Sequence, residues 1–116
     1  MSNAVFYNAY KLKEGTSVED FLATKSSLTE QHVSKHKGWI SSTYLRDGDT
    51  WADYSTWETM DDLKAFIAKS RLNPTDLAKR MYAFIDFGSS KSHIYTVERH
   101  ITPSSIPSIM NQEDTI

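Results

Sequence analysis

Hydrophobic and polar residues near the start of the chain follow a two-residue period, which predicts a β-strand over residues 5–13. Beyond Gly15 the period becomes helical. A helix is predicted over residues 17–35, with Thr16 and Glu19 as a capping box and Gly38 past its basic end. The two strand faces carry Phe6, Asn8, Tyr10 and Leu12 on one side and Val5, Tyr7, Ala9 and Lys11 on the other. The predicted buried face of the helix consists of Val18, Phe21, Leu22, Leu28, His32 and Val33.

A β-hairpin follows this helix. Two segments of strand character, residues 39–46 and 50–58, are separated by an Asp-Gly-Asp sequence that is typical of a tight turn. From Met60 the helical period returns, and Asp61 and Asp62 lie in the first turn, where the helix dipole favours acidic side chains. A second helix is therefore predicted to begin there.

The last third of the predicted domain contains another helix and another strand. Asn73 and Pro74 have the pattern of an N-cap followed by proline at the first helical position, so we expect a separate or kinked helix. Residues 88–92 are predicted to be a flexible loop and residues 93–101 a fourth strand. The residues assigned to the additional helix are Leu77, Ala78, Met81, Tyr82 and Ile85.

The predicted order of elements is β-α-β-β-α-β, the order of the ferredoxin-like fold. This fold is an α+β sandwich with a four-stranded antiparallel sheet. Residues 1–101 are expected to form this single domain. Residues 102–116 contain two prolines and no aromatic residue, so we expect a C-terminal tail that is disordered or packs on a partner subunit.

Large or apolar side chains are predicted on both faces of this sheet. In the third strand, Trp51 and Trp57 share one face and Tyr54 lies on the other. A sheet of this kind covers one face with its own helices, and a single domain of this length has no element left for the second face. We therefore expect a homodimer in which two identical sheets pack face to face.

Composition and charge exclude several classes of protein. The chain has 116 residues, 13 Lys and Arg, 15 Asp and Glu, and no cysteine, which excludes a disulfide framework, a thiolate nucleophile and a Cys-ligated metal. Basic residues are scattered among acidic ones, so no nucleic-acid partner is expected. The first residues lack the pattern of a signal peptide, and no apolar run reaches about 18 residues. We therefore expect no membrane partner and a cytoplasmic location.

Three segments of the chain occur in a combination typical of one protein family. They read FYNAYKLKEG at 6–15, HKGW at 36–39, and YSTWE at 54–58 followed by LKAF at 63–66. In these segments the chain resembles the antibiotic biosynthesis monooxygenase domains of the dimeric α/β-barrel superfamily, most specifically through the Trp-Glu-x₄-Leu-x₂-Phe spacing that begins at Trp57. The resemblance implies a dimeric α/β barrel with a cavity between the sheet and the helices of each subunit.

The resemblance also implies a function and a set of site residues. In one branch of the family the aromatic substrate, once deprotonated, itself reduces oxygen, and the protein needs no metal or flavin. We therefore expect a cofactor-independent monooxygenase acting on a small phenolic or polycyclic aromatic compound, with Asn8 and Trp57 as catalytic residues matched by motif. The expected ligand-binding residues are Tyr54, Phe66 and Met81, with Arg71 and Arg80 as candidates for a cation.

A second branch of the family degrades haem with an asparagine, a tryptophan and a histidine, and of these only the asparagine has a match here, at Asn8. Phe66 occupies the position of a tryptophan in that branch, and Asp76 lies near the position of its histidine. Haem degradation is therefore disfavoured, because the axial iron ligand is missing. No cofactor is expected.

Two alternatives remain open at this stage. The first is a non-catalytic domain that binds a small apolar ligand or serves as an interaction module. The second is a divalent-metal site at His32 and His36, which lie four residues apart on the predicted helix. The competing explanation for these imidazoles is a favourable interaction with the helix dipole, and no metal is predicted.

Acidic residues of the hairpin have a simpler interpretation. Asp47, Asp49 and Asp53 lie in the predicted turn and the strand that follows it. They are expected to be part of that turn and strand and not of a catalytic site.

Overall fold

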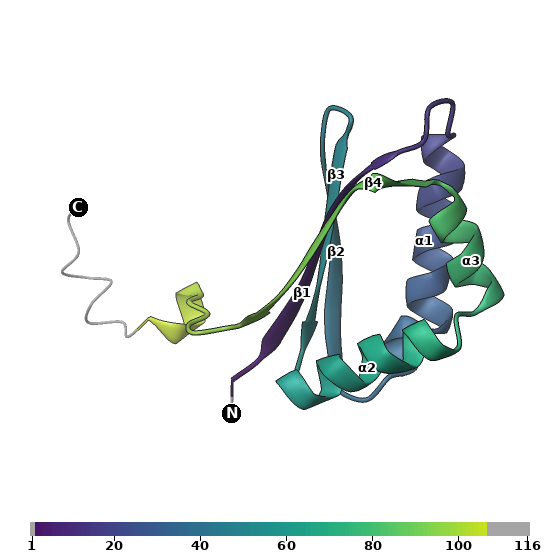
Figure 1. Cartoon of the computed structure of the whole chain (residues 1–116). Coiled ribbons are helices and arrows are strands. Elements are labelled where there is room, and N and C mark those ends of the chain that lie inside the picture. Colours follow the sequence, from purple (N-terminus) through teal and green to yellow (C-terminus); the bar gives the residue numbers. More distant parts are fainter. Residues whose placement is uncertain (1, 107–116) are drawn as a thin grey trace, which may run out of the picture.

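A computed structural model describes residues 2–106 and contains four strands and three α-helices (Figure 1). The elements are β1 Ala4–Leu12, α1 Val18–Gln31, β2 Trp39–Asp47, β3 Thr50–Trp57, α2 Met60–Leu72, α3 Asp76–Ala83 and β4 Ile85–Thr96. Two short 3₁₀ segments follow α1 and β4, namely η1 Val33–Lys35 and η2 Pro103–Ser105. None of the helices in this part of the chain is long and apolar enough to cross a membrane. The predicted tail begins with η2, and residues 107–116 lie outside the described residues.

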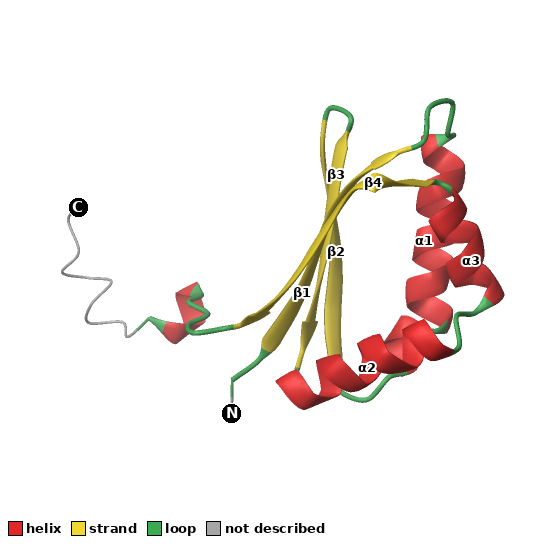
Figure 2. Cartoon of the chain, viewed as in Figure 1, coloured by secondary structure: helices red, strands yellow, loops and turns green. Residues whose placement is uncertain are grey.

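All four strands belong to one antiparallel sheet in the order β2-β3-β1-β4. The three helices lie on one side of it (Figure 2). This arrangement is the predicted ferredoxin-like α+β fold. The predicted alternation of β1 is confirmed, because Ala4 and Tyr10 are buried on the helix-facing side, while Tyr7 pairs with Tyr54 on the opposite side.

The buried core is divided into two clusters at opposite ends of the sheet. In β3, Trp51 belongs to one cluster and Trp57 to the other, and between them the helix-facing positions carry only the short polar side chains of Asp53 and Ser55. β3 therefore contributes no large side chain to the space between the two clusters. The first cluster, beside α1 and α3, consists of Tyr10, Phe21, Trp51, Met81 and Ile85. The second, beside α2, consists of Ala4, Trp57 and Leu63.

The ends of α1 differ from the prediction. Its N-cap is Ser17, whose Oγ accepts a hydrogen bond from the backbone N–H of Asp20 at 3.1 Å, so the expected capping box of Thr16 and Glu19 is wrong. The helix ends at Gln31 and not near residue 35. The backbone then tightens into η1, which is common at helix C-termini.

The start of α3 also differs from the prediction. Thr75 is its N-cap and accepts a hydrogen bond from the backbone N–H of Ala78 at 3.1 Å. Asn73 instead ends α2, where its backbone N–H donates to the carbonyl of Lys69 at 3.0 Å. The N-cap expected at Asn73 is therefore wrong by two positions, because Thr75 supplies the side-chain cap.

The fourth strand is the largest correction. β4 spans Ile85–Thr96, so the expected loop over residues 88–92 is part of the strand, and the expected strand over residues 93–101 ends five residues early. Ala9 of β1 pairs with Lys91, and Lys11 pairs with Asp86. Two positions along β1 therefore correspond to five positions along β4, which leaves three extra residues of β4 in a bulge. Glycine and serine residues in this bulge produced the loop-like pattern.

The face of the sheet turned away from the helices carries few charges. It is open in the single chain, since all three helices lie on the other side (Figure 2). Strand alternation places on it Val5, Tyr7, Ala9, Thr43, Leu45, Ala52, Tyr54, Thr56, His93 and Tyr95, together with the charged Lys91, which pairs with Ala9.

Gly38 connects the η1 segment to β2 in a left-handed conformation, with φ +85°. A Cβ atom at this position would overlap the side chain of Asp62 in the first turn of α2. Gly48, in the hairpin turn, also has a positive φ of +62°, but no atom lies within 4 Å of a Cβ placed there.

We expect Gly38→Ala to lower the free energy of unfolding by about 1–3 kcal/mol more than Gly48→Ala, measured by urea denaturation. Both substitutions carry the cost of a left-handed alanine, and only the one at Gly38 adds the overlap with Asp62. Equal losses in the two variants would show that α2 is not held against this turn.

Candidate functional site

A cavity of about 410 Å³ lies between the helix-facing side of the sheet and the helices, in the space between the two core clusters. We call it the inner cavity. One part of its wall is aromatic and aliphatic, with Phe6, Phe66 and Met81, and another part is polar. The polar residues of the wall are Asn8, Tyr10, Lys25, Thr29, Ser42, Tyr44, Asp53, Tyr54, Ser55, Arg71, Tyr82, Ser90 and Ser92.

A buried ion pair joins α1 to β3 at this cavity. The Nζ atom of Lys25 lies 2.8 Å from Oδ2 of Asp53, and the two side chains are only 10% and 14% exposed. Lys25 follows Phe21 by one helical turn, so the buried face of α1 that contacts Trp51 also directs an ammonium group towards the sheet. The ammonium group lies over two aromatic rings, 5.7 Å from the ring centre of Tyr10 and 5.2 Å from that of Tyr44.

Hydrogen bonds fix the carboxylate of Asp53 from both sides. The hydroxyl of Tyr10 donates to Oδ2 at 2.9 Å, and the Asn8 amide donates to Oδ1 at 3.3 Å. The carbonyl oxygen of Asn8 in turn accepts a hydrogen bond from the hydroxyl of Ser92 at 2.6 Å. Asn8 is therefore held in one orientation by neighbours on two strands.

The two tyrosines near this pair remain protonated. Burial, the charge of Asp53 and the hydrogen bond to it raise the pKa of Tyr10 far above its usual range. Burial also raises the pKa of Tyr44, although its hydrogen bond with Thr29 acts in the opposite direction. Neutral phenols next to an ammonium group act as hydrogen-bond donors and not as bases.

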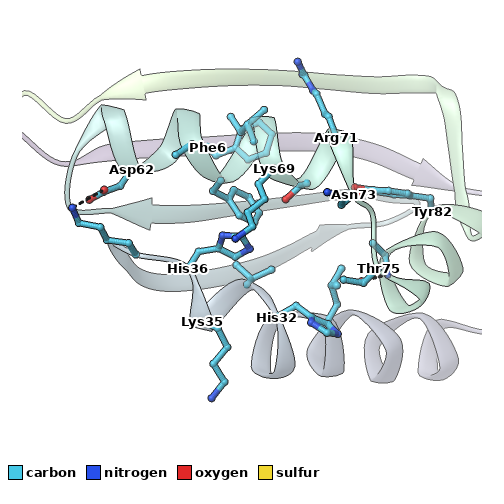
Figure 3. A pocket seen from close by; sticks show the side chains of 18 residues that line it. Phe6, His32, Lys35, His36, Asp62, Lys69, Arg71, Asn73, Thr75 and Tyr82 are labelled. Atoms are coloured by element: carbon cyan, nitrogen blue, oxygen red, sulfur yellow. Dashed lines mark hydrogen bonds and ion pairs between the residues drawn. The ribbon is translucent and has the colours of Figure 1, made fainter.

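A second cavity of about 610 Å³ adjoins the first and lies among α2, η1 and the end of α1 (Figure 3). We call it the outer cavity. The residues that line both cavities are Phe6, Leu28, Val33, Phe66, Arg71 and Tyr82. The outer cavity adds His32, Lys35, His36, Lys37, Asp62 and Lys69, so its wall is more basic than that of the inner cavity.

His36 is packed into the wall of the outer cavity. Its ring contacts Phe66 edge-on, with ring centres 4.9 Å apart. Burial, together with the charges of Lys69 and His32, lowers the pKa of His36 below its usual value. At neutral pH this imidazole is therefore largely uncharged.

Five of the sequence-predicted site residues line the inner cavity, namely Asn8, Tyr54, Phe66, Met81 and Arg71. They come from β1, β3, α2 and α3, so the fold brings together residues that are far apart in the sequence. Their predicted roles in catalysis and binding stay predictions.

Two of the predicted residues, Trp57 and Arg80, line neither cavity. Trp57 is completely buried behind Phe66, with the two rings stacked at 4.7 Å. Tyr54 borders the inner cavity, although strand alternation places it on the opposite face of β3 from Asp53 and Ser55. Arg80 lines a shallow depression between α1 and α3 with Asp20 and Thr24, away from both cavities.

The two histidines considered as a metal pair do not lie on one helix. His32 caps the end of α1, and His36 follows η1, so the helical spacing assumed from the sequence is wrong. Within residues 2–106, no group of three or more His, Cys, Asp or Glu side chains is arranged to hold a metal ion.

Sequence analysis missed the polar centre of the site. Asp53 was grouped with the turn acids, but it lies on the face of β3 that carries Trp51 and Trp57, where a carboxylate needs a partner. The matching signal was Lys25, which interrupts the buried face of α1 between Phe21 and Leu28. A charge on each of two facing apolar surfaces would have indicated the pair.

The arrangement can stabilise a negative charge that develops on a bound molecule. Lys25 supplies an ammonium group whose contact with Asp53 leaves donor capacity for a ligand, and Asn8 supplies an oriented amide. Both groups are fixed before a ligand arrives, and the side chain of Lys25 is buried, where such interactions are stronger than in water. The aromatic wall formed by Phe6 and Phe66 can hold a planar ring.

Comparison with solved structures relates this fold to cofactor-independent oxygenases. The chain is similar to SnoaB, a cofactor-independent oxygenase from Streptomyces nogalater, with TM-score 0.68 and 17% identity over 89% of this chain and 99% of that chain. It is also similar to the ActVA-Orf6 monooxygenase of Streptomyces coelicolor in complex with the ligand Nanaomycin D, with TM-score 0.66 and 17% identity over 88% and 93% of the two chains.

A third similar structure is a dimeric protein of unknown function with a ferredoxin-like fold from Bacteroides fragilis, with TM-score 0.53 and 19% identity over 82% of this chain and 96% of that chain. Neither a family model nor a curated protein sequence matches the chain. The structural likenesses confirm the predicted fold of antibiotic biosynthesis monooxygenase-type proteins. At these identities they establish the fold and not the activity.

We expect Lys25→Met to lower the free energy of unfolding by about 3–5 kcal/mol, because it leaves the Asp53 carboxylate buried without its counter-ion. In a double-mutant cycle with Asp53→Leu, the double variant should lose less than the sum of the single losses. Urea denaturation measures the stability of the two single variants and of the double variant.

Lys11→Met is the matched control, because the side chains of the Lys11–Asp49 ion pair are 52% and 82% exposed and the pair should contribute little to stability. Additive losses at Lys25 and Asp53 would contradict a coupled pair.

Proposed function

We propose that this chain binds a small phenolic or polycyclic aromatic molecule in the inner cavity and oxidises it with molecular oxygen as a cofactor-independent monooxygenase. The observation that carries the proposal is the cavity itself, in which an aromatic wall faces the oriented amide of Asn8 and the ammonium group of Lys25. The fold shared with cofactor-independent oxygenases supports it.

The proposed reaction needs no external reductant. An aromatic substrate with an oxidisable CH₂ group, such as an anthrone, loses a proton and forms a delocalised anion that transfers electrons to oxygen. One oxygen atom becomes the new carbonyl oxygen, and the other leaves as water with the two hydrogens of the CH₂ group. The role of the protein is to exclude water and to stabilise the anion, which Lys25 and Asn8 are placed to do.

We also propose that the chain acts as a homodimer through the open face of the sheet. This face carries the cross-strand pair of Tyr7 and Tyr54, with Val5 and Ala52 beside it and few charges. A continuous face of this kind favours a partner surface, and a second copy offers the same face. The dimeric Bacteroides fragilis protein with this fold supports the proposal.

Oxygen uptake with a panel of anthrones and hydroquinones tests the proposed activity. We expect turnover above the buffer rate, and a loss of roughly a hundredfold in kcat/KM for Asn8→Ala, because a single oriented donor at a developing anion contributes about that much. Lys79→Gln is the control, since Lys79 is exposed on α3 and lines neither cavity.

Binding of these compounds without oxygen uptake would instead favour the alternative of a non-catalytic ligand-binding domain. An Asn8→Ala variant as fast as the parent would contradict the role of this amide.

Sedimentation velocity over a dilution series tests the proposed dimer. The parent chain should sediment as a dimer, and the double variant Tyr7→Glu/Tyr54→Glu should sediment as a monomer, because it buries like charges at the centre of the interface. Leu72→Glu is the matched control, because Leu72 is 79% exposed on α2, on the helix side of the sheet. A monomeric parent chain would refute the proposal.

A further inference from the structure

The outer cavity has an uneven distribution of charge. Its wall contains four cationic side chains, Lys35, Lys37, Lys69 and Arg71, and one carboxylate, Asp62. The whole chain, by contrast, has a formal net charge of −2. The basic character of this cavity is therefore a local feature and not a consequence of a basic protein.

The four cations are not equivalent. Lys37 is paired with Asp62 at 4.0 Å. In Figure 3 the side chains of Lys35 and Arg71 extend away from the centre of the cavity, whereas Lys69 reaches from α2 towards the ring of His36. Among residues 2–106, Lys69 forms no ion pair with a carboxylate.

Lys69 is accompanied by two other bases. After burial, the charges of Lys69 and His32 also lower the pKa of His36, so positive charge on these neighbours disfavours a proton on its ring. An anion placed among them would counter this effect. His36 also contacts Phe66, which lines both cavities, so such an anion would lie next to the space available for an aromatic ring.

We propose that the outer cavity binds the carboxylate of an aromatic acid through Lys69, with His36 and His32 beside it, while the ring system of the same molecule occupies the inner cavity. The inference rests on the proposed binding of an aromatic compound in the inner cavity. It narrows the ligand class from aromatic compounds in general to aromatic carboxylic acids. A single ammonium group with two imidazoles suits a singly charged carboxylate better than a group of higher charge.

Because the inner and outer cavities share wall residues, a single ligand that extends through both is the simplest occupant. Phe6, Phe66 and Tyr82 line both cavities, so a ring held against them in the inner cavity presents its substituents to the outer one. The inner cavity alone, at about 410 Å³, is within the range of small-molecule sites. Lys69 is exposed, so its contribution will be modest and sensitive to salt.

A matched pair of ligands tests the inference by titration calorimetry on the full chain. Anthraquinone-2-carboxylate and anthraquinone-2-carboxamide share one ring system and differ in charge, and neither has a CH₂ group to oxidise. We expect the carboxylate to bind about fivefold more tightly than the carboxamide, with the preference declining as salt is raised. Lys69→Gln should remove this preference, and Lys79→Gln, which removes the same charge from an exposed position on α3, should keep it.

Proton NMR titration of the His36 ring gives a second, site-specific measurement. The carboxylate should raise the pKa of His36 and the carboxamide should not, because a nearby anion favours the protonated imidazole. Phe66 of α2 contacts this ring, and the charges of Lys69 on α2 and His32 at the end of α1 act on it. The other charged groups of the cavity wall are Lys35, Lys37, Asp62 and Arg71.

The outcomes separate this inference from the proposed function. Equal affinity for the two compounds, or equal loss of preference in Lys69→Gln and Lys79→Gln, would overturn the carboxylate site and leave the proposed oxygenase untouched. Binding of neither compound would overturn both, because no ring then enters the inner cavity. Oxygen uptake absent with every substrate, together with a carboxylate preference that depends on Lys69, would refute the enzyme and support the acid-binding site.

Discussion

The interior of this fold depends on the separation of two tryptophans on one face of β3. Trp51 packs against Phe21 of α1, and Trp57 packs against Phe66 of α2, so each end of the sheet has a large ring between strand and helix. The positions between them carry Asp53 and Ser55, which are too short to fill the space between the sheet and the helices. Helices held at a distance by rings at both ends leave space in the middle, and the inner cavity occupies that space.

A polar centre in this space imposes a second requirement. A carboxylate at Asp53 would cost several kcal/mol of free energy if it were buried alone, so the position depends on Lys25, Tyr10 and Asn8. These partners come from α1 and β1, and their hydrogen bonds fix the relative positions of helix and sheet. Pairs of this kind add little to net stability but favour one arrangement over others, and here they also leave an ammonium group and an amide facing a cavity.

The sequence predicted the parts of the structure that depend on local periodicity. The alternation in β1 and the Asp-Gly-Asp turn predicted strands of the sheet, and the apolar face that contains Phe21 predicted α1. The sequence pattern is misleading where tertiary contacts decide which structure a segment adopts. Residues 88–92 look like a loop, but pairing with β1 makes them part of a bulged strand. The Lys25–Asp53 pair is not apparent from the sequence, because neither element alone shows that a charge on the other faces it across the interior.

Because of the three extra residues in the β4 bulge, one wall of the inner cavity can change in length while the register of the sheet stays the same. Phe87 and Ser90 line the inner cavity from this bulge, while the ladder pairs β4 with β1 on both sides of it. Insertions or deletions in the bulge would move these side chains without shifting the pairs at either end. Relatives could therefore diverge in the depth of the cavity by changing the length of this single segment. For an engineer, it is a position where the shape of the site can be altered while the rest of the sheet keeps its pairing.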